Sequence, residues 1–161
     1  MNKAAGYKRS PPNHLTEKQK KFWRRNMGYR SDVIIAVAFK DKAHRDEVWA
    51  VYCMDPRVQK HDLTGVWKNY DEGDYPVLWY QANYVKWYDS YGDVKGIEHM
   101  IDVASTFAQE RGLHYASIML RVGEEMTDME SAERAAVPDG SMMSMLYDLC
   151  GIRSEVYHNF D

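Results

Sequence analysis

The sequence predicts one α/β (α+β) domain in which an antiparallel sheet carries two helices on one face. Three observations lead to this prediction. Residues 33–39 are apolar and rich in β-branched side chains, residues 94–108 repeat apolar side chains at helical spacing, and residues 114–122 alternate between two faces. A length of 161 residues suits one domain with one hydrophobic core.

The first thirty residues form a basic arm on an acidic body. They hold nine Lys or Arg residues and one Glu, a charge of +8, which leaves −11 for the other 131 residues of a chain whose net charge is −3. Such an arm can reach toward nucleic acid, toward the acidic face of a neighbouring subunit, or into water. The sequence leaves these three alternatives open.

The arm contains one predicted helix. Thr16 and Gln19 match the capping-box pattern that opens a helix, and Gly28 can end it. We expect this helix to dock on the body through Phe22 and Trp23.

A strand and a helix follow the arm. Residues 33–39 have the two-sided apolar pattern of an interior strand. Asp41 can cap the next helix, and Asp55-Pro56 stops it. The apolar positions near helical spacing are Ala43, Val48, Val51 and Tyr52.

The second half of the domain is predicted as hairpin, helix and strand. Leu63 to Lys68 and Val77 to Tyr88 are two extended segments around the turn-rich residues 69–74. Asp93 can cap a long helix, which Gly112 ends in the left-handed conformation. With the strand at 114–122, the order becomes β-α-β-β-α-β, which is typical of the ferredoxin-like split fold over residues 31–123.

The rest of the chain is predicted as an appendix to this domain, residues 124–161. It contains an acidic stretch, a Met-rich helix from Ser141 to Leu149 that Gly151 ends, and a short strand at Val156. The two predicted helices of the domain cover one face of the sheet, and the other face is aromatic along Val77 to Tyr88. We expect another subunit or a ligand to cover it, and therefore an oligomer.

Several classes of function lack support in the sequence. The six histidines show no HxxxH or HxH spacing, so no metal site is predicted, and no Gly-rich phosphate loop is present. Cys53 and Cys150 lie far apart, so we expect free core thiols in a reducing cytoplasm. The longest uncharged apolar run has seven residues, whereas a membrane span needs about twenty.

The residues from 62 to 77 alternate carboxylates with aromatic side chains. This combination suits a cation joined to a flat aromatic group, such as a sulfonium nucleoside, because ring faces attract cations and a carboxylate supplies opposite charge. The alternative is a solvated turn whose aromatic side chains face the core.

This segment resembles the bacteriophage S-adenosylmethionine lyase family, whose members were formerly called hydrolases. Asp62-Leu63-Thr64-Gly65 matches the family motif, with Trp67 at its aromatic position, Glu72 at its acidic position and Tyr75 at its later aromatic position. The chain departs from the pattern at Asn69, which replaces the second glycine, and at Tyr115, where relatives often carry a polar amide.

The resemblance implies an enzyme that cleaves S-adenosyl-L-methionine to 5'-methylthioadenosine and L-homoserine lactone, with no cofactor. It implies a trimer with the substrate between subunits, and an anti-restriction role in the cytoplasm of an infected bacterium. Glu72 is then the catalytic residue that holds the cationic end of the substrate, and the candidate substrate-binding residues are Trp67, Tyr70, Tyr75 and Tyr115.

Two other functions remain open. The first is a non-enzymatic phage protein that binds and inhibits a host defence or metabolic enzyme through its acidic face or aromatic sheet. The second is an oligomeric nucleic-acid accessory protein, which the acidic body disfavours because phosphate binding needs a positive surface.

Overall fold

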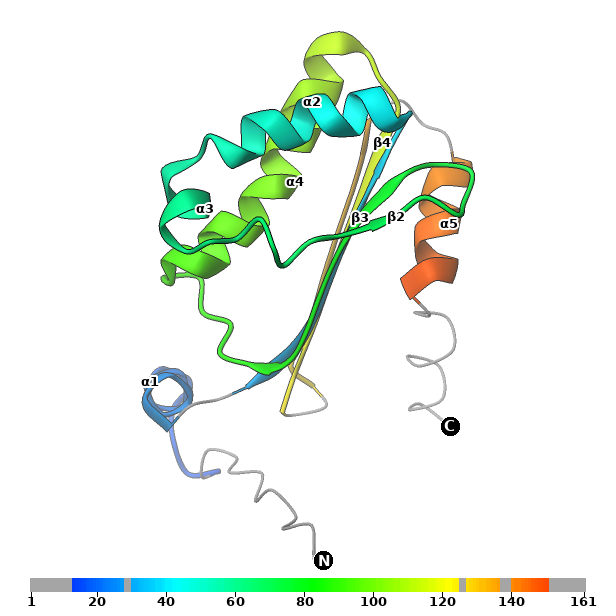
Figure 1. Ribbon diagram of the computed structural model, residues 1–161. Helices are drawn as coiled ribbons and strands as arrows, with labels where there is room; N and C mark the ends of the chain where they lie inside the picture. Colours follow the sequence, from blue (N-terminus) through cyan, green and yellow to red (C-terminus); the bar gives the residue numbers. More distant parts are fainter. Residues whose placement is uncertain (1–12, 28–29, 125–126, 137–139, 151–161) are drawn as a thin grey trace, which may run out of the picture.

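A computed structural model describes residues 13–27, 30–124, 127–136 and 140–150, and confirms the predicted α/β class (Figure 1). Five strands form one antiparallel sheet, and helices pack against it. The helices are α1 (Glu17–Met27), α2 (Lys42–Cys53), α3 (Pro56–Lys60), α4 (Gly92–Arg111) and α5 (Gly140–Cys150). The strands are β1 (Ser31–Phe39), β2 (Lys68–Tyr70), β3 (Val77–Val85), β4 (Tyr115–Gly123) and β5 (Met129–Ala136).

The sheet has the strand order β2-β3-β1-β4-β5, with β1 at its centre. Ile35 of β1 lies opposite Tyr80 of β3 on one side and Met119 of β4 on the other. A split β-α-β arrangement requires β1 to lie between β3 and β4, as it does here. The ferredoxin-like identification itself stays a prediction.

The central strand β1 is buried on both faces because it is apolar at successive positions. Its larger side chains, Val33, Ile35, Val37 and Phe39, enter the core beneath α2 and α4, which we call the helix-side core. Its alanines, Ala36 and Ala38, face the opposite way. Small side chains on that face let another helix approach the sheet closely.

Helix α2 begins at the predicted cap, where the Asp41 side chain accepts a hydrogen bond from the His44 amide at 2.8 Å. Its buried stripe is His44, Val48 and Tyr52, at spacings of four residues. Ala43 and Val51, which the sequence placed among the apolar positions, are exposed. The imidazole of His44 takes the core position between two phenyl rings: it is perpendicular to the ring of Phe39 at 5.3 Å and stacks on the ring of Phe107 at 5.5 Å.

Helix α4 ends as predicted at Gly112, whose φ of 62° is left-handed. Its start differs from the prediction, because Tyr91 is the cap residue and its side chain makes no capping bond. Asp93 lies in the first turn, where its carboxylate accepts a hydrogen bond from the Val94 amide at 2.9 Å. The positive end of the helix dipole favours an acid there.

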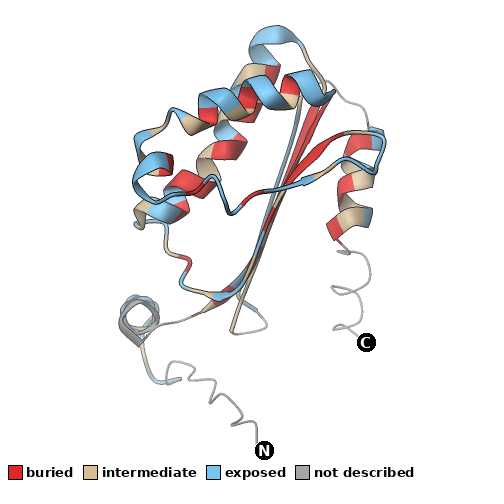
Figure 2. Ribbon diagram, viewed as in Figure 1, coloured by how far each residue is buried: buried red, intermediate tan, exposed pale blue. Residues whose placement is uncertain are grey.

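The second sheet face is partly covered by the chain's own helix α5 (Figures 1 and 2). The sequence predicted this helix but assigned the face to a neighbouring subunit or a ligand. Apolar residues at spacings of four turn one face of α5 onto the sheet, so a third layer forms. The buried members of this α5-side core are Ala36, Ala38, Val77, Ala116, Ile118, Met142, Leu146 and Cys150.

The predicted strand from Leu63 to Lys68 is wrong. The Asp55 side chain caps the additional short helix α3, and turns fill the chain from His61 to Val66. Leu63 and Trp67 are buried in the helix-side core as anchors of these turns, not as alternate residues of a strand. Only the last predicted position, Lys68, begins β2.

The acidic stretch after residue 124 contains a strand that the sequence did not predict. Strand β5 pairs with β4 from Met129 to Ala136 at the outer edge of the sheet. Seven of its eight residues are exposed, so it carries no apolar alternation from which a strand could be recognised.

At the other end of the chain, helix α1 has the predicted capping box, with the Gln19 amide 3.3 Å from Thr16 Oγ1 and the Thr16 amide 2.9 Å from Gln19 Oε1. The Phe22 side chain is 70% exposed, so the expected docking through Phe22 is wrong. The Trp23 side chain and the predicted positions Gly28, Gly151 and Val156 lie outside the described residues.

Candidate functional site

The structure holds Trp67 at the border of the helix-side core. Its side chain is 7% exposed, and its indole Nε1 donates a hydrogen bond to the Tyr52 hydroxyl at 3.0 Å. Burial raises the pKa of Tyr52 to about 12, so the phenol stays neutral at physiological pH. Trp67 is therefore fixed in one orientation by a neutral partner.

The two tyrosines of the hairpin lie on the other side of the sheet. Tyr70, at the end of β2, and Tyr75, in the turn at residues 71–76, are half-buried against the α5-side core. The Tyr75 hydroxyl lies 3.3 Å from Ser141 Oγ at the start of α5. We call residues 71–76 the hairpin turn.

Glu72 is exposed at the tip of the hairpin turn. Within the described part of the chain, no hydrogen bond or ion pair joins its carboxylate to another residue. It does not line the cavity described below. A single copy of the chain thus leaves Glu72 turned outward.

Tyr115 lies inside the protein under α4 and is 1% exposed. Its hydroxyl is 2.6 Å from Ser117 Oγ and 3.3 Å from the Ile101 carbonyl, and burial raises its pKa to about 12. The sequence offered Tyr115 as a substrate-binding residue. The structure makes it a core residue with both of its hydrogen-bonding needs met internally.

The predicted residues are therefore divided among three places. Trp67 and Tyr115 belong to the helix-side core, Tyr70 and Tyr75 pack beside α5, and Glu72 faces outward. No single pocket of one chain brings them together among the described residues.

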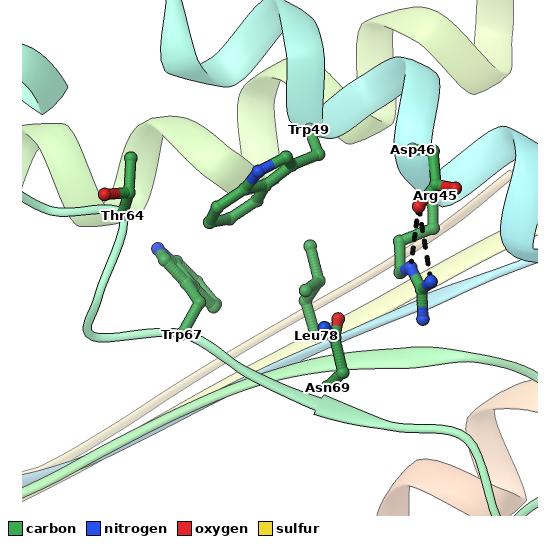
Figure 3. Close-up of a pocket in the computed structure, with 7 residues that line it drawn as sticks. All are labelled: Arg45, Asp46, Trp49, Thr64, Trp67, Asn69 and Leu78. Atoms are coloured by element: carbon green, nitrogen blue, oxygen red, sulfur yellow. Dashed lines mark hydrogen bonds and ion pairs between the residues drawn. The ribbon is translucent and has the colours of Figure 1, made fainter.

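One residue of the predicted set does line a cavity. The cavity has a volume of about 230 Å³ and lies between α2 and the chain that leads into β2 (Figure 3). We call it the α2 cavity. Its walls are Arg45, Asp46, Trp49, Thr64, Trp67, Asn69 and Leu78. Thr64 and Trp67 come from the Asp-Leu-Thr-Gly-x-Trp motif on which the resemblance rests.

Two indoles give the α2 cavity its aromatic character. Trp49 comes from α2 and Trp67 from the loop before β2, and Figure 3 shows their rings on adjoining walls. The Tyr52 ring contacts both, with centroid distances of 5.6 Å to Trp49 and 6.1 Å to Trp67. Because Tyr52 is fully buried, it fixes the spacing of the two indoles.

Charged side chains stand at the other end of the α2 cavity. Asp46 is well exposed, and Arg45 Nε lies 3.2 Å from its carboxylate. Arg45 also binds Asp71, the first residue of the hairpin turn, at 2.6 Å. Arg45 is only 11% exposed, so it ties α2 to the turn that carries Glu72.

Sequence reasoning missed the contribution of α2 to this site. Trp49 follows Val48 directly, so it lies beside the buried stripe of α2 and keeps part of its ring exposed. A large aromatic residue next to, but outside, the core stripe was the available signal. Arg45 and Asp46 carried no signal, because only the fold brings them to the motif.

In the part of the chain that the structure describes, no three His, Cys, Asp or Glu side chains lie close enough together to bind a metal ion. Likewise, none of its described helices is long and apolar enough to cross a membrane.

Comparisons with family models, curated proteins and solved structures found no match to the chain.

Proposed function

We propose that the chain binds S-adenosylmethionine in the α2 cavity and cleaves it to 5'-methylthioadenosine and homoserine lactone. One observation carries the proposal: Thr64 and Trp67 of the lyase-like motif line a cavity with a second indole and a carboxylate. Flat aromatic walls suit adenine, and indole faces attract the neighbouring sulfonium.

The size of the α2 cavity limits which part of the substrate it encloses. Its 230 Å³ is below the range of roughly 300–1,000 Å³ usual for pockets that enclose a whole small ligand. In the proposal the adenine enters between Trp49 and Trp67. The methionine part lies at the mouth, where Asp46 faces its ammonium group.

The proposed reaction needs no protein nucleophile. A carboxylate oxygen of the methionine part attacks its own γ-carbon, the bond from that carbon to sulfur breaks, and the electron pair leaves with sulfur as a neutral thioether. Both charges disappear, and no proton is transferred. Holding the chain of the substrate in the cyclising conformation is then the main task of the protein. Aromatic walls, which solvate charge less well than water, favour the neutralised products.

Glu72 acts from a neighbouring copy in this proposal. Its own chain directs it outward, while the Arg45–Asp71 ion pair holds the turn in place. An assembly with the substrate between subunits, as in the implied trimer, would bring the Glu72 of one copy to the α2 cavity of the next. Arg45 is then a positioning residue for Glu72.

Turnover of S-adenosylmethionine tests the proposal, with two matched tryptophan variants. Purified protein should release methylthioadenosine, and Trp49→Leu should reduce the rate at least tenfold because it removes one wall of the α2 cavity. Trp79→Leu makes the same change on the α5-side face of β3, so it should keep most of the activity. Equal losses in both variants, or no product from the native chain, would reject the proposal.

Mixing experiments test the placement of Glu72. Glu72→Gln and Trp49→Leu should each be nearly inactive alone. Refolded together, they should regain activity, because some interfaces then combine an intact Glu72 with an intact cavity. Activity in Glu72→Gln alone would remove this residue from the mechanism, and failure of the mixture would place both residues in one chain's site.

A further inference from the structure

The outer edge of β5 is an unpaired sheet edge. Strand β5 pairs with β4 along its whole length and ends the strand order, so its other edge directs backbone N–H and C=O groups outward. Within the described ranges, no strand pairs with this edge. Unpaired edges of this length readily accept another strand.

Strand β5 has few of the features that protect an edge from pairing. It contains no proline, and its register with β4 runs without a bulge from Met129 to Ala136. Its charges are of both signs: Glu130 and Glu133 against Arg134. An edge protected by repulsion would carry charges of one sign.

We infer that β5 pairs with β5 of a second copy of this chain across a two-fold axis at Ala132. In this antiparallel register, Glu130 of each copy lies opposite Arg134 of the other, which gives two complementary pairs. The remaining pairs are Met129 with Ala135 and Ser131 with Glu133, neither of which opposes like charges.

Other registers of the same pairing are less favourable. An axis at Glu130, Glu133 or Arg134 would place two like charges directly opposite each other. An axis at Ser131 would leave no opposite-charge pair within the strand. Among the axes that pair at least five residues of β5, which run from Ser131 to Arg134, only the axis at Ala132 gives opposite-charge pairs without a like-charge pair.

The two paired side chains already point to one face of the sheet. Arg134 lies 2.8 Å from Asp102 of α4, and Glu130 lies 3.0 Å from Arg121 of β4. Residues 130 and 134 have the same parity in the strand, so they share a face. They can therefore meet their partners across the axis on the same face of the joined sheet.

This contact is independent of the proposed enzyme function. The β5 edge is the opposite edge of the sheet from β2, with β3, β1 and β4 between them. Pairing at β5 leaves the α2 cavity and the hairpin turn open to any other subunit contact.

A charge exchange tests the contact by sedimentation of the full chain over a range of concentrations. Arg134→Glu should weaken self-association about tenfold or more, because it opposes Glu130 at both pairs. Adding Glu130→Arg to it should restore association, although both intrachain ion pairs stay broken. Lys95→Glu makes the same charge change at an exposed position of α4, outside both the β5 edge and the α2 cavity, and should have no effect.

A cysteine on the axis tests the register. In a Cys53→Ser background, Ala132→Cys should form a covalent dimer under mild oxidation, because the two introduced thiols oppose each other. Ala135→Cys, which faces Met129 in this register, should not. A chain that stays monomeric, association that Arg134→Glu leaves unchanged, or cross-linking at 135 instead of 132 would each overturn the inference.

Discussion

The indole of Trp67 shows how single residues prepare the proposed site before any ligand binds. Its nitrogen is bonded to the buried Tyr52 hydroxyl, and the Tyr52 ring also contacts Trp49. Folding therefore already orders both indoles, so ligand binding costs less side-chain conformational entropy. Glu72 is the opposite case, an exposed side chain that must be ordered by its partner.

Gly112 gives a prediction on stability. Its φ of 62° is accessible to glycine at little cost, and an added Cβ would meet nothing within 4 Å. Gly112→Ala should therefore lower the free energy of unfolding by about 1 kcal/mol through backbone strain alone. Chemical denaturation measures this loss. Gly65→Ala, which also enters open space but at an ordinary φ, should leave stability within about 0.5 kcal/mol of the native value.

His44 gives a prediction on pH dependence. Burial lowers its pKa below 6.5. Its Nδ1 accepts a hydrogen bond from the Lys40 amide, and its buried Nε2 has no hydrogen-bond partner among the described residues. A lowered folded-state pKa means that the unfolded chain binds the proton more tightly. The stability that neutral His44 contributes is therefore fully present above pH 6.5 and is lost as the pH falls below it.

Thermal unfolding between pH 7.5 and 5 checks this dependence. His44→Phe keeps a ring between Phe39 and Phe107 and should flatten the slope. An unchanged slope in His44→Phe would contradict the assignment.

At the scale of elements, helix α5 holds the second sheet face through three residues at spacings of four: Met142, Leu146 and Cys150. They lie over Ala36 and Ala116, whose small side chains admit a helix. The second sheet face, which the sequence assigned to another subunit or a ligand, is thus partly covered by the chain's own helix.

Shortening a buried side chain of α5 should lower the stability of the protein. Leu146 is fully buried, so Leu146→Ala should lower the free energy of unfolding by about 2–5 kcal/mol through lost burial and a residual cavity. Leu149→Ala makes the same change at a half-buried position of the same helix and should cost clearly less. Equal losses in urea denaturation would show that α5 packs in another orientation.

The elements that the sequence predicted are those with dense apolar patterns. Helix α4 buries one face at the period of its backbone, and strands β1 and β4 bury successive residues on both faces of the sheet. The chain around Leu63 to Trp67 was misassigned because its large apolar residues anchor turns. Strand β5 was missed because it is held by pairing with β4 and buries almost nothing.

The candidate site was predictable only in part. The motif pointed to Thr64 and Trp67, which line the α2 cavity, but Tyr115 was misplaced because strand alternation cannot tell a core tyrosine from a ligand-binding one. Trp49 joins them through tertiary packing between α2 and the loop before β2. Periodicity carries no information about such a contact.

At the scale of the whole molecule, three surfaces have separate assignments. The helix-side face and its neighbouring loop form the α2 cavity, α5 covers part of the opposite face, and β5 offers an open edge. The proposed catalytic contact and the inferred two-fold contact lie at opposite edges of the sheet. A chain that uses both would form assemblies with an even number of copies.

The central claim is that the α2 cavity receives the adenine of S-adenosylmethionine. A crystal structure with S-adenosylhomocysteine, which lacks the reactive sulfonium, tests it most directly. The account predicts the adenine between the indoles of Trp49 and Trp67, with Glu72 of a neighbouring copy at the amino-acid end. A ligand bound anywhere else, with the α2 cavity empty, would contradict it.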